Sequence, residues 1–136
     1  MSGTVVLDAS AVLAFLQGEP GEETVAQALQ SQRCLVTAAN QAEVISRAQD
    51  RGGERAVIEH LLGELGYEVI DCTAADGAQA GWLRTATRTS ALSLSDRLCL
   101  AAAQRLQAPV LTADRQWLGL GAALGLNVVS IRPAAA

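Results

Sequence analysis

The sequence predicts an α/β fold with a central parallel β-sheet and helices on both of its faces. Short apolar stretches typical of strands alternate along the chain with longer stretches of helical periodicity. Strands separated by helices pair in parallel through right-handed crossovers. With 136 residues, of which 50% are hydrophobic, the chain suits a single folded domain. We expect that domain to span residues 1–136, with a short tail at residues 131–136.

The first part of the chain predicts a strand, a helix, a turn, a second helix and a second strand. Residues 4–8 (TVVLD) form a short β-branched run, and residues 10–17 have helical spacing that stops at the GEPG turn of residues 18–21. Residues 22–30 begin with two acids, which favour the positive end of a helix. Residues 34–37 (CLVT) are the second candidate strand.

The middle of the chain predicts three helices and one strand. Asn40 is expected to cap a helix that ends at the glycine pair 52–53. A second amphipathic helix covers residues 54–65, and a strand follows at residues 67–71. A longer helix is expected over about residues 74–87.

The last part of the chain contains one helix that is predicted to be buried. Residues 97–106 (RLCLAAAQRL) are apolar on nearly every face, which is typical of a helix inside a protein. Residues 109–112 form a candidate strand, Trp117 lies in a short helical turn, and residues 127–131 form the last strand.

The charged residues exclude several kinds of chemistry. All ten basic residues are arginine, so Schiff-base chemistry, P-loop ATPases and lysine-assisted phosphoaspartate sites are ruled out. The formal net charge is −4, whereas affinity for a nucleic-acid backbone comes from cationic groups. Any function on nucleic acid must therefore rest on local arginines or on bound metal ions.

The cysteines and the amino terminus predict a cytoplasmic protein. The three cysteines show no C-x-x-C spacing, and with His60 as the single histidine they form no zinc-binding set. Cys34 and Cys99 lie in apolar runs, where a buried thiol is the usual interpretation. The sequence contains neither a signal-peptide pattern nor an apolar run long enough for a membrane span, so no membrane partner is expected.

Acidic residues stand where an open parallel sheet binds its ligands, at the carboxyl ends of strands. Asp8 ends the first strand and Asp114 follows the strand at residues 109–112, while Glu43 and Asp96 fall in the first turns of two helices. Four carboxylates brought together would repel one another, and a divalent cation relieves that repulsion. Mg²⁺ prefers oxygen ligands and can activate a water for phosphodiester hydrolysis.

Four stretches of the chain resemble the PIN domain of VapC-type toxins. They are LDASAVLAFL at residues 7–16, NQAEVISR at 40–47, ALSLSDRLCLAAA at 91–103 and APVLTADRQW at 108–117. The resemblance implies a single PIN-like domain with catalytic, metal-binding acids at Asp8, Glu43, Asp96 and Asp114. It also implies endoribonuclease activity that depends on Mg²⁺ or Mn²⁺. Supporting or RNA-binding roles are expected for Ser10, Asn40, Thr112, Arg97 and Arg115.

The same resemblance implies partners. We expect a homodimer, an RNA substrate and a cognate VapB-type antitoxin that holds the activity off. Apolar residues near Leu13, Phe15, Leu16 and along residues 54–65 are the candidate docking surface. Ser95 stands where the family usually has glycine, and we expect it to be tolerated because serine is a good helix cap.

Each candidate residue also has an ordinary structural interpretation. Asp8 could be a strand-end turn residue, and Asp96 could be favoured by the helix dipole. Glu43 could form a surface ion-pair ladder with Arg47 and Arg51, which lie four and eight residues on.

Four other residues are better explained by structure, and four arginines are undecided. Asp71 and Asp76 match no ligand of the family and are interpreted as surface acids. Trp82 and Trp117 are interpreted as packing residues. Arg84 and Arg88, like Arg97 and Arg115, suit either RNA phosphates or salt bridges.

Two rival functions remain. A receiver domain or haloacid-type phosphatase would also have an aspartate after its first strand, but both use a lysine, and the phosphatase motif needs a second acid where Ser10 stands. A PIN domain without activity that only docks an antitoxin or nucleic acid is the closer alternative. Nuclease activity that depends on metal would separate it from the enzyme.

Overall fold

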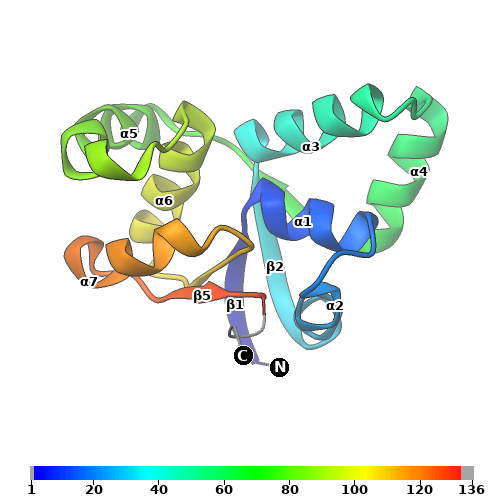
Figure 1. Cartoon of the computed structure of the whole chain (residues 1–136), viewed down its shortest axis with the longest axis horizontal. Coiled ribbons are helices and arrows are strands. Elements are labelled where there is room, and N and C mark those ends of the chain that lie inside the picture. Colours follow the sequence, from blue (N-terminus) through cyan, green and yellow to red (C-terminus); the bar gives the residue numbers. More distant parts are fainter. Residues whose placement is uncertain (1, 133–136) are drawn as a thin grey trace.

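The computed structural model describes residues 2–132, and its centre is a five-stranded parallel sheet in the order β3-β2-β1-β4-β5 (Figure 1). The strands are β1 (Ser2–Leu7), β2 (Gln32–Thr37), β3 (Glu68–Ile70), β4 (Val110–Thr112) and β5 (Val128–Ser130). The chain proceeds from β1 outward to β3 and then crosses back to β4 on the other side of β1. The point at which the strand order reverses therefore lies between β1 and β4, which is where open α/β sheets bind ligands.

Helices cover both faces of this sheet, as the sequence predicts. They are α1 (Ala9–Leu16), α2 (Glu22–Ser31), α3 (Ala38–Asp50), α4 (Arg55–Leu65), α5 (Ala74–Ala86), α6 (Leu94–Leu106) and α7 (Gly121–Leu124), with 3₁₀ turns η1 (Arg88–Ser90) and η2 (Arg115–Leu120). In Figure 1, α1 to α4 lie to the right of the sheet and α5 to α7 lie to its left. None of the helices within residues 2–132 combines the length and the apolar character that crossing a bilayer requires.

The alternation of side chains along the strands builds two cores. Val5 and Leu7 of β1 face one core with α1, α2, α3 and α4, whereas Val6 faces a second core with α5 and α6. Cys34 and Cys99 are buried as predicted, and the helix that was expected to be buried is the inner helix of the second core.

Several boundaries differ from the predictions for local reasons. The helix expected to start at Asn40 begins at Ala38, because the side chain of Thr37 caps it by accepting a hydrogen bond from the Asn40 N–H (3.1 Å). Ser93, not Ser95, caps α6. The helices η1 and α7 were not predicted. The part of the expected tail from residue 133 onward lies outside the described residues.

The two tryptophans differ in their surroundings. Trp117 is only 1% exposed and packs in the second core, so its interpretation as a packing residue is confirmed. Trp82 on α5 is 79% exposed, so the same interpretation is wrong for it. The reason is that Ala80 and Leu83 supply the inward face of α5, which leaves position 82 on the outward face.

A close approach between two segments predicts that Gly21→Ala is strongly destabilising. Gly21 has φ +100°, and a Cβ built there would lie 2.6 Å from the carbonyl oxygen of Ile131. We expect the substitution to lower the free energy of unfolding by more than ~2 kcal/mol, measured by urea denaturation. Gly52 is the matched control, since its φ is +88° and nothing lies within 4 Å of a Cβ there. Gly52→Ala should cost only ~1 kcal/mol, and equal losses in the two variants would contradict the steric argument.

Candidate active site

Asp8 joins the end of β1 to the start of α1. Its extended backbone makes it the N-cap of α1, and its carboxylate accepts a hydrogen bond from the Ala11 N–H (2.8 Å). The same carboxylate accepts hydrogen bonds from the hydroxyls of Ser10 (2.7 and 2.8 Å) and Thr112 (2.6 Å). The side chain is buried at 2% exposure, so its position is determined by partners on two segments.

Thr112 and Ser10 connect β1 and β4, the two strands on either side of the point where the strand order reverses. We call this point the switch point. β1 and β4 are paired at Leu7 and Leu111, so Thr112 lies beside Asp8 at the carboxyl ends of both strands. The Ser10 hydroxyl also accepts a hydrogen bond from the Ala113 N–H (2.9 Å). Ser10 and Thr112 therefore lie beside Asp8, and their supporting or RNA-binding roles stay predictions.

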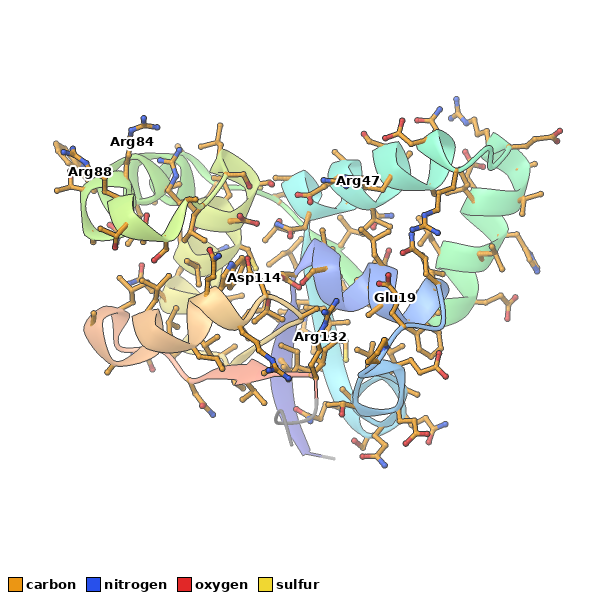
Figure 2. All side chains as sticks on the ribbon, in the orientation of Figure 1. Glu19, Arg47, Arg84, Arg88, Asp114 and Arg132 are labelled. Atoms are coloured by element: carbon orange, nitrogen blue, oxygen red, sulfur yellow. The ribbon has the colours of Figure 1, made fainter. Side chains whose placement is uncertain are left out.

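Asp114 lies two residues after the end of β4 and is the N-cap of η2. Its N–H donates to the Thr112 hydroxyl oxygen (3.0 Å), and its carboxylate accepts a hydrogen bond from the Gln116 N–H (2.9 Å). Figure 2 shows Asp114 near the middle of the molecule, between the two groups of helices. It is half-buried, whereas the neighbouring Arg115 is exposed on η2.

Glu43 on α3 and Asp96 on α6 lie toward the same carboxyl ends of β1 and β4. The Ser95 hydroxyl donates to Glu43 Oε1 at 2.6 Å, which joins the first turn of α6 to α3. Asp96 forms a capping box with Ser93, in which the Ser93 N–H donates to Asp96 Oδ2 (3.0 Å) and the Asp96 N–H donates to Ser93 Oγ (3.1 Å).

Asn40 is the buried link between three of these segments. Its Oδ1 accepts a hydrogen bond from the Ala9 N–H (2.7 Å), and its Nδ2 donates to the Thr37 hydroxyl (2.9 Å) and to the Ser95 carbonyl (3.0 Å). The side chain is fully buried. The prediction that Asn40 caps a helix is wrong, because Thr37 has that role and the Asn40 amide is used between α1, α3 and α6.

Burial and neighbouring charge raise the pKa of two of the four acids, Asp8 and Asp96. Burial, with a smaller contribution from the charge of Asp96, raises the pKa of Asp8 from 3.8 to about 7 against its hydrogen bonds. Burial also raises the pKa of Asp96, with added contributions from the charges of Glu43 and Asp114 and opposing hydrogen bonds from Ser93. Asp96 is therefore the acid that interacts with each of the other three.

The donor set suits a hard divalent cation. Its side-chain donors are oxygens, which Mg²⁺ and Mn²⁺ prefer, and Mg²⁺ needs only one or two direct carboxylates because it keeps several waters. Within residues 2–132, no three acidic, histidine or cysteine side chains converge closely enough to hold an ion together. Each carboxylate is instead engaged in local hydrogen bonds, so an ion here would be bound partly through water or after rotation of these side chains.

Arg97 is buried, and two of the other sequence interpretations are wrong. Arg97, expected to support RNA binding, is 8% exposed and donates from Nη1 to the Ala80 carbonyl (2.9 Å), so it lies between α5 and α6. Asp76 is not a surface acid: it is 2% exposed and accepts two hydrogen bonds from Arg105 (2.8 and 3.0 Å), which lower its pKa. Among the ion pairs of the described residues, none joins Glu43 to an arginine, so the predicted ladder is absent.

The sequence does contain a signal for the orientation of Asp76 and of Asp96. Thr73 and Asp76, like Ser93 and Asp96, are separated by three residues and form capping boxes. That spacing predicts that Asp76 is turned back onto its own helix rather than outward. By contrast, the sequence contains no signal for the contact between Ser95 and Glu43, because 52 residues separate them.

We expect the contact between Ser95 and Glu43 to couple their contributions to stability. A charge-assisted hydrogen bond in a half-buried position contributes ~1 kcal/mol or more. In a double-mutant cycle of Ser95→Ala and Glu43→Ala without added metal, the free energies of unfolding should be non-additive by about 1 kcal/mol. Ser46→Ala paired with Glu43→Ala is the control, since the Ser46 hydroxyl donates to the Ala42 carbonyl. Additive losses in both cycles would contradict the contact.

Comparison with known proteins agrees with this architecture. The profile of the PIN domain family matches residues 5–121. Among curated protein sequences, none matches the chain significantly.

Several solved structures share the fold. A toxin–antitoxin complex from Klebsiella pneumoniae aligns with a TM-score of 0.71 and 17% identity, over 96% of this chain and 99% of that one. VapBC2 from Rickettsia felis, bound to a promoter DNA fragment, aligns with a TM-score of 0.70 and 16% identity, over 93% and 98%. VapC20 from Mycobacterium tuberculosis, a toxin that cleaves the sarcin-ricin loop, aligns with a TM-score of 0.69 and 17% identity, over 86% and 95%. With its match over residues 5–121 and its five-stranded parallel sheet, this chain belongs to the PIN domain family, in a fold of the VapC type.

Proposed function

We propose that this chain is the toxin of a toxin–antitoxin pair and a metal-dependent endoribonuclease. The observation that carries the proposal is the hydrogen-bond network at the switch point of a PIN fold, which holds Asp8 against β4 and joins α1, through Asn40 and Ser95, to Glu43. Membership of the family and the fold shared with VapC toxins support it. The buried, unpaired thiols of Cys34 and Cys99 are consistent with a reducing cytoplasm as its location.

The residues of the candidate site have distinct roles in this proposal. Asp8, Asp96 and Asp114 would hold Mg²⁺ or Mn²⁺, and Glu43 would bind the ion directly or through water. The bound ion would neutralise charge on the phosphodiester and lower the pKa of a coordinated water. In the hydrolysis, the oxygen of water bonds to phosphorus and the 3′ oxygen departs with a proton, which leaves a 5′ phosphate.

The hydroxyls around Asp8 prepare it for that role. Ser10 and Thr112 donate to the carboxylate, which stabilises its ionised form against the cost of burial. Because three donors from α1 and β4 hold this carboxylate, its oxygens are oriented before any ligand arrives. Asn40 holds α1, α3 and α6 at fixed relative positions, so it is a positioning residue.

Purified protein tests the activity directly. We expect RNA cleavage with Mg²⁺ or Mn²⁺ that stops on addition of EDTA and returns when the metal is restored. Cleavage at the same rate in EDTA would overturn the metal mechanism. Metal-independent RNA binding without any cleavage, after removal of contaminating nucleases, would favour the alternative of a PIN domain that only binds.

A pocket beside α4 offers a binding site for the proposed antitoxin. A pocket of about 190 Å³ lies where α1 meets α4, and Leu13 and Leu16 are among the residues that line it. Val57 and Leu61 line the same pocket and are 53% and 48% exposed, which leaves apolar surface for a partner helix. We propose that a VapB-type antitoxin docks here, and that the toxin forms a homodimer. Leu16→Asp should weaken co-purification with the antitoxin, and unchanged co-purification would argue against this docking site.

A further inference from the structure

A small pocket lined by three arginines lies at the end of α5, away from the four acids. Its volume is about 140 Å³, and it is lined by Arg84, Thr87, Arg88, Ala91, Leu92 and Arg97. No acid is among these lining residues. Figure 2 shows Arg84 and Arg88 together at the outer end of the left-hand group of helices.

The charge of this pocket is not neutralised by the described part of the chain. The arginines with an ion pair within residues 2–132 are Arg33, Arg55 and Arg105, and none of them lines the pocket. In a chain whose formal net charge is −4, three of the ten arginines thus share one small hollow without a carboxylate. Such a local excess of positive charge attracts an anion.

Arg97 makes this case stronger because its side chain is buried. It is 8% exposed, and the one hydrogen bond that its guanidinium makes within residues 2–132 runs from Nη1 to the Ala80 carbonyl (2.9 Å). A guanidinium has five N–H donors, and burying a charged group is costly unless it is paired. An anion in the pocket would supply the missing partner and would be held by the planar donor groups that suit phosphate.

The backbone that closes the pocket is also unusual. Ala91 has φ +51°, a left-handed conformation that residues with a Cβ rarely adopt. This conformation ends η1 and turns the chain toward Leu92 and the start of α6. Backbone strain of this kind is concentrated at binding sites, where the surrounding structure maintains it.

The first turn of α6 connects the pocket with the four acids. Asp96 and Arg97 are consecutive, and their side chains diverge by the ~100° that one residue turns along an α-helix. On one side of this turn, Ser95 donates to Glu43 on α3, and on the other side Arg97 contacts Ala80 on α5. An RNA strand that crosses the amino-terminal end of α6 would therefore contact carboxylates on one side and guanidinium groups on the other.

We propose that this pocket binds a phosphate of the RNA strand outside the cleavage point, as a second contact that holds the substrate across α6. The inference rests on the proposed function, because it assumes that the scissile phosphate lies at the four acids. Thr87 donates its hydroxyl to the Leu83 carbonyl, so the three arginines supply the donors for the phosphate.

RNA binding in EDTA tests the pocket separately from catalysis. The variant is Arg84→Gln combined with Arg88→Gln, because both side chains are exposed and their loss should leave the fold intact. With a labelled single-stranded RNA, we expect the Kd to rise at least tenfold. The slope of log affinity against log salt should become shallower by about 1.4, which corresponds to two phosphate contacts at ~0.7 each.

Arg51→Gln combined with Arg55→Gln is the matched control. These arginines have the same spacing and are also exposed, but they lie at the junction of α3 and α4. The control should change the Kd less than twofold. Equal effects of the two double variants would overturn the pocket, because they would show only a loss of overall positive charge. Inorganic phosphate should raise the melting temperature of the parent protein more than that of Arg84→Gln, Arg88→Gln.

The outcomes separate the pocket from the proposed function. The pocket variant could lose RNA affinity while the parent protein shows no metal-dependent cleavage. That result would keep the phosphate site and overturn the nuclease. Metal-dependent cleavage with unchanged RNA affinity in the pocket variant would keep the nuclease and overturn the site. Unchanged RNA affinity with weakened binding of an acidic peptide would assign the pocket to a protein partner and would also overturn the proposal.

Discussion

Asp96→Asn should reduce RNA cleavage by ~100-fold or more while the protein remains folded. The asparagine keeps an oxygen that can accept from the Ser93 N–H, and the Asp96 N–H bond to Ser93 Oγ does not depend on the side chain. The helix start is therefore preserved, but the charge that interacts with Asp8, Glu43 and Asp114 is lost. Removing a charged ligand from a metal-dependent site has effects of this size. Cleavage rates under single-turnover conditions measure the loss.

Asp71→Asn is the control for that substitution. Asp71 follows β3 at the carboxyl end of a neighbouring strand, but it is exposed, as the sequence predicted. The Asp71→Asn variant should cleave RNA at the parental rate. If Asp96→Asn also retained the parental rate with an unchanged melting temperature, the four-carboxylate mechanism would be wrong.

The stability of the protein without added metal should fall as the pH rises from about 4 to about 7. The buried carboxyl of Asp8 keeps its proton up to a pKa of about 7, whereas in the unfolded chain it ionises near its usual 3.8. Between these values the unfolded state binds fewer protons than the folded state, so the free energy of unfolding decreases with pH. The raised pKa of Asp96 acts in the same direction. The loss attributable to Asp8 is at most ~4 kcal/mol, since each pKa unit corresponds to about 1.4 kcal/mol.

Urea denaturation at a series of pH values, with and without Asp8→Asn, measures this effect. The variant cannot ionise at position 8, so its stability should depend less on pH and should exceed that of the parent at pH 8. Saturating Mg²⁺ should stabilise the parent more at pH 8 than at pH 5, because the ionised carboxylates bind the ion. A parent protein whose stability is flat between pH 4 and pH 8 would contradict the burial of a protonated Asp8.

Much of the fold could be predicted from local patterns. The β-branched runs near residues 4–8, 34–37 and 109–112 became β1, β2 and β4, because their side chains alternate between two cores. The helix at residues 97–106 was recognised as buried from its apolar faces. The strand-end positions of Asp8 and Asp114 followed from the same patterns, because an acid after a strand can be read directly from the chain.

The surroundings of individual side chains could not be predicted in this way. Asp76 was interpreted as a surface acid but is paired with Arg105, which lies 29 residues away. Trp82 was interpreted as a packing residue but is exposed. Both errors arise because burial depends on which elements lie opposite a side chain, and that is a property of the tertiary packing.

By itself, the sequence determined the alternation of strands and helices, the absence of lysine chemistry and the oxygen-rich set of candidate ligands. Only the tertiary structure decided that Ser95 donates to Glu43, that Asn40 links three helices, and that Arg84, Arg88 and Arg97 share a pocket. The physical reason is that periodicity and capping are local interactions within a few residues. The charge and hydrogen-bond partners of a site come from segments that meet only when the sheet is assembled.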